Sequence, residues 1–158
     1  MIKINKPLID KISKKSKTSH RNRANINFHK CPQDFLQRML CVINKDSYIR
    51  PHKHEKPDKA EVFIVLKGKA LAMEFNNAGK IIDFIILDAK ESFGVEFSPK
   101  SWHTIVSLKN KTVLYEIKDG PYDPGTDKIF APWSFEENTK GAKQFLKEIK
   151  NQISAKLK

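Results

Sequence analysis

Residues 50–61 read RPHKHEKPDKAE, so His52 and His54 stand one residue apart in a stretch that is typical of a β-strand. Residues i and i+2 of a strand point to the same side, so these two imidazoles can face one point. Glu61 and His103 follow in later strand-like stretches and can approach the same point from neighbouring strands. The sequence therefore predicts a single metal site formed by His52, His54, Glu61 and His103.

Short stretches rich in β-branched and aromatic residues recur on both sides of the histidine pair. They cover residues 23–29, 48–52, 60–66, 70–75, 81–87, 95–97, 103–108 and 112–117. Turn-forming sequences separate them, notably Lys67-Gly68 and the segment 76–79. Many short strands at this spacing predict an all-β dominated domain, either a sandwich or a small barrel.

Four other segments depart from this pattern. Residues 2–12 are compatible with a short helix or an edge strand, and the polar residues 14–22 predict a loop. Residues 33–43 favour a short helix, with a strand as the alternative for their second half. Residues 139–157 carry an apolar stripe opposite lysines, which predicts a helix that includes Leu157.

The length of 158 residues is that of one domain with a single core. We expect an N-terminal segment over residues 1–22, a barrel with a strapped tail over 23–135, and a C-terminal helix over 136–158. The tail is irregular because residues 119–125 read DGPYDPG, which cannot continue a strand.

The chain is strongly basic, with a formal net charge of +12 from 30 Lys and Arg against 18 Asp and Glu. Such a charge suits nucleic acid, but many of the lysines lie near the chain ends, and the sequence has no recognition helix or aromatic platform. A solvated lysine-rich surface is the preferred interpretation, with no nucleic-acid partner. No long apolar run appears, so we expect no membrane insertion. Cys31 and Cys41 form no CxxC motif, which favours a cytoplasmic protein with reduced, buried thiols.

The metal-ligand candidates also match a family pattern. His52-Lys53-His54, then Glu61 and Gly68, and later the stretch from Pro99 to His103, resemble the two motifs of the cupin superfamily. The chain departs from that pattern in a longer stretch between His54 and Glu61, and in Lys100, where a glycine is common.

Further segments are similar to WbuC-type cupin-fold metalloproteins, which are found among bacterial O-antigen gene clusters. The similar segments are residues 23–29, 37–38, 47–54, 102–104, 116–124 and 130–133. The resemblance implies a cupin jelly-roll β-barrel with a short N-terminal and a longer C-terminal helical addition, holding one metal ion. It also suggests a homodimer formed through edge strands.

Three imidazole nitrogens and one carboxylate oxygen suit a divalent transition metal: Fe, Mn, Zn, Ni or Co. Four protein ligands leave one or two positions open on a metal that accepts five or six, so Lewis-acid catalysis is available. The alternative is that His52, His54 and His103 are ordinary surface or core histidines. Two paired histidines, a later carboxylate and a third histidine after a proline turn argue for the metal.

A second set of polar residues alternates with apolar ones in the strand-like stretch 23–29. Arg23, Asn25 and Asn27 offer a guanidinium fork and two amides, and we expect them to bind substrate together with Arg50 and Glu116. Arg50 has the same parity as His52. Two arginines beside a cation favour an anionic or sugar-derived small molecule, such as a nucleotide sugar or a sugar acid. The alternative places these residues at turns, sheet edges or the surface.

His29, whose imidazole titrates near neutrality, or an open-site water activated by the metal is the predicted general base. Tyr48 is a weaker catalytic candidate, chosen because its parity matches that of the inward-facing residues. Glu116 is the other weaker candidate, and Tyr48 and Glu116 are each also compatible with a purely structural role.

The leading hypothesis is a metal-binding cupin that binds or acts on an anionic or sugar-derived small molecule in bacterial surface-polysaccharide metabolism. The sequence does not decide whether it is an enzyme; an isomerase, a lyase or a hydrolase would each suit the site. The alternative is a non-catalytic ligand-binding or sensor cupin that regulates a partner protein.

Overall fold

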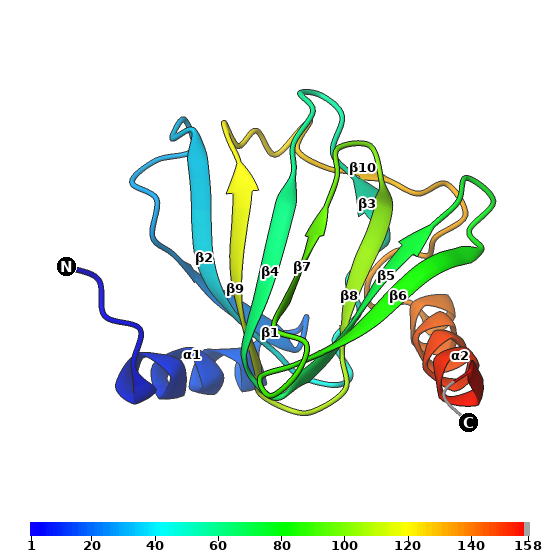
Figure 1. Ribbon diagram of the computed structural model, residues 1–158, viewed down its shortest axis with the longest axis horizontal. Coiled ribbons are helices and arrows are strands. Elements are labelled where there is room, and N and C mark those ends of the chain that lie inside the picture. Colours follow the sequence, from blue (N-terminus) through cyan, green and yellow to red (C-terminus); the bar gives the residue numbers. More distant parts are fainter. Residues whose placement is uncertain (157–158) are drawn as a thin grey trace.

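Two five-stranded antiparallel sheets form the body of the molecule, and one helix lies near each end of the chain (Figure 1). The computed structural model describes residues 1–156. The first sheet contains, in spatial order, β1 (Arg23–Asn27), β2 (Leu36–Ile43), β9 (Thr112–Asp119), β4 (Glu61–Lys67) and β7 (Gly94–Phe97). The second contains β10 (Ile129–Phe130), β3 (His52–Lys53), β8 (Trp102–Ser107), β5 (Lys69–Phe75) and β6 (Ile81–Asp88).

Strands that are distant in the chain are neighbours in each sheet, as in a jelly roll. β2 pairs with β9, and β3 pairs with β8. The two sheets face each other and diverge toward the top of Figure 1. This arrangement confirms the predicted all-β jelly-roll with helical additions at both ends.

The facing surfaces of the two sheets form an apolar core at the end where they converge. Strand alternation places Phe63 and Val65 of β4 inward, and Leu114 of β9 joins them. Ala72 of β5 and Ile105 of β8 meet these side chains from the opposite sheet. Burial of this set closes one end of the barrel and leaves the other end for polar side chains.

Helix α1 (Lys6–Thr18) covers the outer face of the first sheet, where Ile12 packs on Leu40 and Val42. Asn5 caps the helix by accepting a hydrogen bond from the amide of Leu8. Of the two alternatives for residues 2–12, the helix is therefore correct, since α1 begins within them at Lys6. The loop predicted over residues 14–22 is wrong for residues 14–18, which belong to α1. Serine hydroxyls in this polar part of the helix donate to helix carbonyls, and the serines are buried against the sheet.

Helix α2 (Lys140–Lys156) covers the outer face of the second sheet. Leu146, Ile149 and Ile153 pack on a cluster that includes Met73 and Val106. The predicted C-terminal helix is thus confirmed, although Leu157 lies outside the described residues. Neither described helix is both long enough and apolar enough to cross a membrane.

Three local predictions need correction. The helix favoured over residues 33–43 is strand β2, which pairs with β1 on one side and with β9 on the other. The strand predicted over residues 48–52 is reduced to β3, because the chain before His52 pairs with no neighbouring strand. Cys31 is exposed in the connection between β1 and β2, whereas Cys41 is buried as expected.

Candidate metal centre

The four predicted ligands come together between the two sheets. The nitrogen and oxygen atoms that His52, His54, Glu61 and His103 can offer to a metal lie within 4.8 Å of one another. His52 and His103 are cross-strand neighbours in the second sheet, while Glu61 begins β4 of the first. All four side chains are buried, with at most 2% of each residue exposed. Antiparallel pairing therefore joins His52 and His103, whereas Glu61 reaches them from the facing sheet and not from a neighbouring strand.

Hydrogen bonds to backbone carbonyls fix the orientation of all three imidazoles. Nδ1 of His52 donates to the carbonyl of Arg50 at 2.9 Å, and Nδ1 of His103 donates to the carbonyl of Ser101 at 2.9 Å. Nδ1 of His54 donates to the carbonyl of Asp127. A carbonyl oxygen only accepts, so each Nδ1 carries the proton and each Nε2 presents a lone pair to the cluster.

The inward-facing atoms of the cluster lack partners of their own. Among the described residues, no hydrogen bond reaches Nε2 of His52, Nε2 of His54 or Oε1 of Glu61. Nε2 of His103 lies 3.0 Å from Oε2 of Glu61. Lone pairs converging on a carboxylate in a buried space need a cation, so this donor set fits a divalent transition metal.

The ionisation of the cluster suits metal binding as well. Burial, aided by the positive charge of Lys128, lowers the pKa of His52 well below its ordinary value. Burial alone would raise the pKa of Glu61, but the close imidazoles of His103 and His54, together with the charge of Lys118, hold it well below its usual range. The neutral imidazole and the carboxylate are the forms that bind metals.

A buried charge network that the sequence did not predict supports the cluster. The carboxylate of Asp127 accepts from Nζ of Lys59 at 2.7 Å and from Nζ of Lys118 at 2.5 Å. Lys118 also approaches Oε1 of Glu61 at 4.0 Å, and Lys59 donates to the carbonyl of Pro121. The two lysines and Asp127 are each at most 3% exposed. Asp127 therefore binds both lysines through its side chain and orients His54 through its backbone.

Three of the four candidate ligands, His52, Glu61 and His103, line a cavity of about 310 Å³. Of the predicted substrate-binding residues, Arg23, Asn25, Arg50 and Glu116 line this cavity. Lys118 and Lys128, which were not predicted, line it too. The cavity therefore brings positively charged groups close to the cluster, as an anionic ligand requires.

Three of the lining residues are held by other parts of the protein. The guanidinium of Arg23 forms two hydrogen bonds with the carboxylate of Glu137, at 2.6 and 2.9 Å. Arg50 donates to the hydroxyl of Ser134 at 2.9 Å. Glu116 accepts from the thiol of Cys41 at 3.3 Å, and burial together with the nearby charge of Glu61 raises the pKa of Glu116 to about 8.

The remaining predicted residues lie away from the cavity wall. Asn27 is exposed and accepts from the amide of Asn25 at 2.6 Å. His29 accepts from the backbone amide of Arg38 at 3.2 Å.

Tyr48 packs beneath α2, where burial is the main cause that raises its pKa to about 12. Tyr48 does not point to the same side as His52, as an even spacing within one strand would require, because the chain between them is not a strand. Catalytic roles for His29 and Tyr48 stay predictions.

A family model covers this architecture from α1 to near the end of β6. Residues 4–87, more than half of the 158, match the model of a domain of unknown function, DUF6016. The chain belongs to the DUF6016 family. The part that matches the DUF6016 model includes His52, His54 and Glu61, and His103 follows it. No curated protein matches the sequence.

Solved structures similar to this DUF6016 chain have the cupin fold. KdgF from Halomonas sp. is 13% identical, with a TM-score of 0.51 over 65% of this chain and 82% of KdgF. The capsular polysaccharide assembling protein CapF from Staphylococcus aureus is 19% identical, with a TM-score of 0.59 over 72% of this chain and 30% of CapF. L-ribose isomerase from Cellulomonas parahominis is 12% identical, with a TM-score of 0.56 over 77% of this chain and 71% of the isomerase. At these identities the likeness establishes the fold, which is the cupin fold expected from the sequence.

Proposed function

We propose that this chain is a metal-binding cupin that binds and acts on an anionic or sugar-derived small molecule in bacterial surface-polysaccharide metabolism. The observation that carries the proposal is the cluster of three oriented imidazoles and one carboxylate beside a cavity lined with cations. The resemblance to WbuC-type proteins and the cupin fold shared with CapF support the polysaccharide setting. A cytoplasmic location and a homodimer formed through an edge strand belong to the same proposal.

His52, His54, Glu61 and His103 would hold one divalent ion, whose chemical contribution is that of a Lewis acid. The chain itself orients the three imidazoles and excludes water from their outer sides. Glu116 lies on the cavity wall, and its raised pKa gives it the protonation range of a group that exchanges a proton near neutrality.

A non-catalytic ligand-binding or sensor cupin is the second candidate. It is favoured by the positions of His29 and Tyr48, because neither predicted catalytic residue is among those that line the cavity. The two candidates share the metal and the ligand class and differ in whether the bound molecule is converted.

Metal analysis of the purified protein tests the shared part of the proposal. We expect one transition-metal ion per chain in the wild type and none retained in His52→Ala or His103→Ala, while circular dichroism shows that both variants fold. His20→Ala, which changes an exposed histidine outside the cluster, is the matched control and should keep the metal. Wild-type protein without a stoichiometric ion would refute the proposal.

A panel of nucleotide sugars and sugar acids then separates the two candidates. Turnover of a panel member by the metal-loaded protein supports the enzyme. Saturable binding without turnover supports the sensor or binding module. Light scattering of the same samples tests the proposed homodimer.

A further inference from the structure

The arginines that seemed suited to bind an anion are already bound within the protein. Arg23 holds Glu137 through a two-pronged contact, which uses the fork that a ligand carboxylate would need. Arg50 donates to Ser134, and its guanidinium carbon lies 4.8 Å from the centre of the Phe130 ring. Both guanidiniums therefore fasten the segment that precedes α2 onto the barrel.

The buried lysines of the site also have partners within the protein. Lys59 and Lys118 share the carboxylate of Asp127. Releasing either of them to a ligand would leave Asp127 with less compensation in a buried site, which is costly. Arg21 lines the cavity as well, but it is exposed to solvent.

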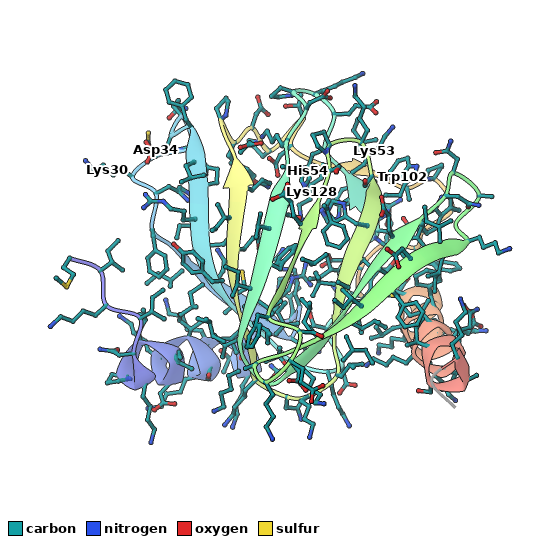
Figure 2. The ribbon with its side chains drawn as sticks, viewed as in Figure 1. Lys30, Asp34, Lys53, His54, Trp102 and Lys128 are labelled. Carbon is teal, nitrogen blue, oxygen red and sulfur yellow. The ribbon has the colours of Figure 1, made fainter. Side chains whose placement is uncertain are left out.

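Lys128 differs from all of these cations. Among residues 1–156 its ammonium group takes part in no hydrogen bond or ion pair, although the residue is only partly exposed. Lys128 directly precedes β10, in which Ile129 packs into the outer core, and Lys128 and Phe130 line the cavity. In the view of Figure 2, Lys128 and His54 both project onto the region where the two sheets diverge. Within the described part of the chain, Lys128 is thus a partly buried cation of the cavity that forms no ion pair.

The rest of the cavity limits the size and character of what Lys128 can bind. Its volume of about 310 Å³ is at the lower end of the range for small-molecule sites, which suits one sugar ring and not an enclosed nucleotide. Met39, Ile49 and Phe130 contribute apolar surface, while Asn25 and Glu116 offer polar groups. A compact ligand with an apolar face, hydroxyl groups and one negative group matches this wall.

We propose that Lys128 anchors the negative group of a monosaccharide-sized acid, a carboxylate or a phosphate ester, in the cavity beside the metal cluster. The inference rests on the proposed function for the general ligand class, and adds the anchoring residue and the size limit. It also explains why the extended segment before β10 is held so firmly by Asp127, since Lys128 is the next residue.

Calorimetric titration of the full-length, Co²⁺-loaded protein tests this proposal. D-Glucuronate and glucose 6-phosphate serve as the acidic probes, and D-glucose is their uncharged counterpart. We expect at least one acid to bind at least about tenfold more tightly than glucose, because a charge-assisted contact in a partly buried site is worth that much. The stronger of the two acids identifies the negative group as a carboxylate or as a phosphate.

Substitutions at Lys128 locate the effect. Lys128→Met should weaken binding of the preferred acid by at least about tenfold, and Lys128→Arg should largely restore it. Lys90→Met removes an exposed lysine from the connection between β6 and β7 and should change nothing. Equal binding of the acid by wild type and Lys128→Met would overturn the proposal, as would a wild type that binds neither acid or binds glucose equally well.

The visible spectrum of Co²⁺ separates this result from the fate of the proposed function. An unchanged spectrum in Lys128→Met shows that the metal site is intact while the acid has lost its anchor. A wild type that takes up no Co²⁺ refutes the metal centre, and Lys128-dependent binding of the acid is then measured on the metal-free protein.

Discussion

The two ends of the barrel differ in chemistry although the same strands build both of them. At the converging end, β4 and β9 present apolar side chains inward; at the diverging end, toward the top of Figure 1, the inward positions of the same strands are ionisable. Val65 gives way to Glu61 along β4, and Leu114 gives way to Glu116 and Lys118 along β9. The strands therefore provide a rigid apolar base on which a charged site is assembled.

The comparison also shows what each end needs for stability. The apolar end requires only close packing. The ionisable end requires partners for its buried charges, and Asp127 supplies one for Lys59 and Lys118 from a segment outside the strands. If the two ends are energetically distinct, substitutions in one should leave the properties of the other unchanged.

The largest effect is expected at Asp127. Asp127→Asn leaves the ammonium groups of Lys59 and Lys118 buried without a carboxylate between them. We expect the free energy of unfolding to fall by about 3–5 kcal/mol, measured by urea denaturation.

Asp58→Asn is the control for this prediction, since it breaks an exposed pair with Lys100 and should cost less than about 1 kcal/mol. Equal losses in the two variants would show that the network at the open end is not a stabilising feature.

Leu114→Ala tests the apolar end. This side chain is fully buried between the sheets, so its truncation should lower the free energy of unfolding by about 3 kcal/mol. Metal stoichiometry, measured by elemental analysis, should stay at the wild-type value. A variant that folds but loses its metal would contradict the independence of the two ends.

Metal withdrawal should act on the open end alone. At a free metal concentration of 100 times the dissociation constant, binding stabilises the folded protein by about 2.7 kcal/mol, and a chelator should remove this increment. The shift in melting temperature on adding chelator measures it. His52→Ala should show no such shift, while Leu114→Ala should show the full shift from a lower starting point.

Acidification should produce the smallest and most gradual loss. Burial would raise the pKa of Asp127, but Lys118 and Lys59 outweigh this effect and lower it. A carboxyl group whose pKa is lower in the folded than in the unfolded protein stabilises the fold at pH values above its unfolded-state pKa of about 3.9. This stabilisation is lost as the pH falls through the folded-state pKa. Metal-free wild type should therefore lose more stability below about pH 4 than metal-free Asp127→Asn does. Parallel pH profiles of the two proteins would contradict this assignment.

Local patterns were sufficient to predict most of the strands and the convergence of the four candidate metal ligands. His52 lies in β3, His54 directly follows that strand, and His103 lies opposite His52 through a single cross-strand pairing. The C-terminal helix was equally predictable, because its apolar stripe repeats over several turns. These features depend on a few neighbouring residues and a regular backbone.

The features that escaped prediction depend on distant partners. Lys59 and Lys118 look like ordinary surface lysines in the sequence, and only the folded chain brings Asp127 between them. Residues 33–43 have apolar spacing that fits either a helix or a strand, and pairing with β1 and β9 selects the strand. Tyr48 shows the limit of parity arguments, which fail where the chain leaves the sheet.

The hydrogen bond from His54 to the carbonyl of Asp127 sets an order of events during synthesis. A ribosome releases all four metal ligands before it releases Asp127, so the nascent chain carries the complete donor set while the ring of His54 still rotates freely. Only when the later segment docks does that ring acquire a fixed tautomer and direction. Firm retention of the proposed ion would therefore be a late step in maturation, and we expect a chain truncated before residue 127 to exchange its metal rapidly.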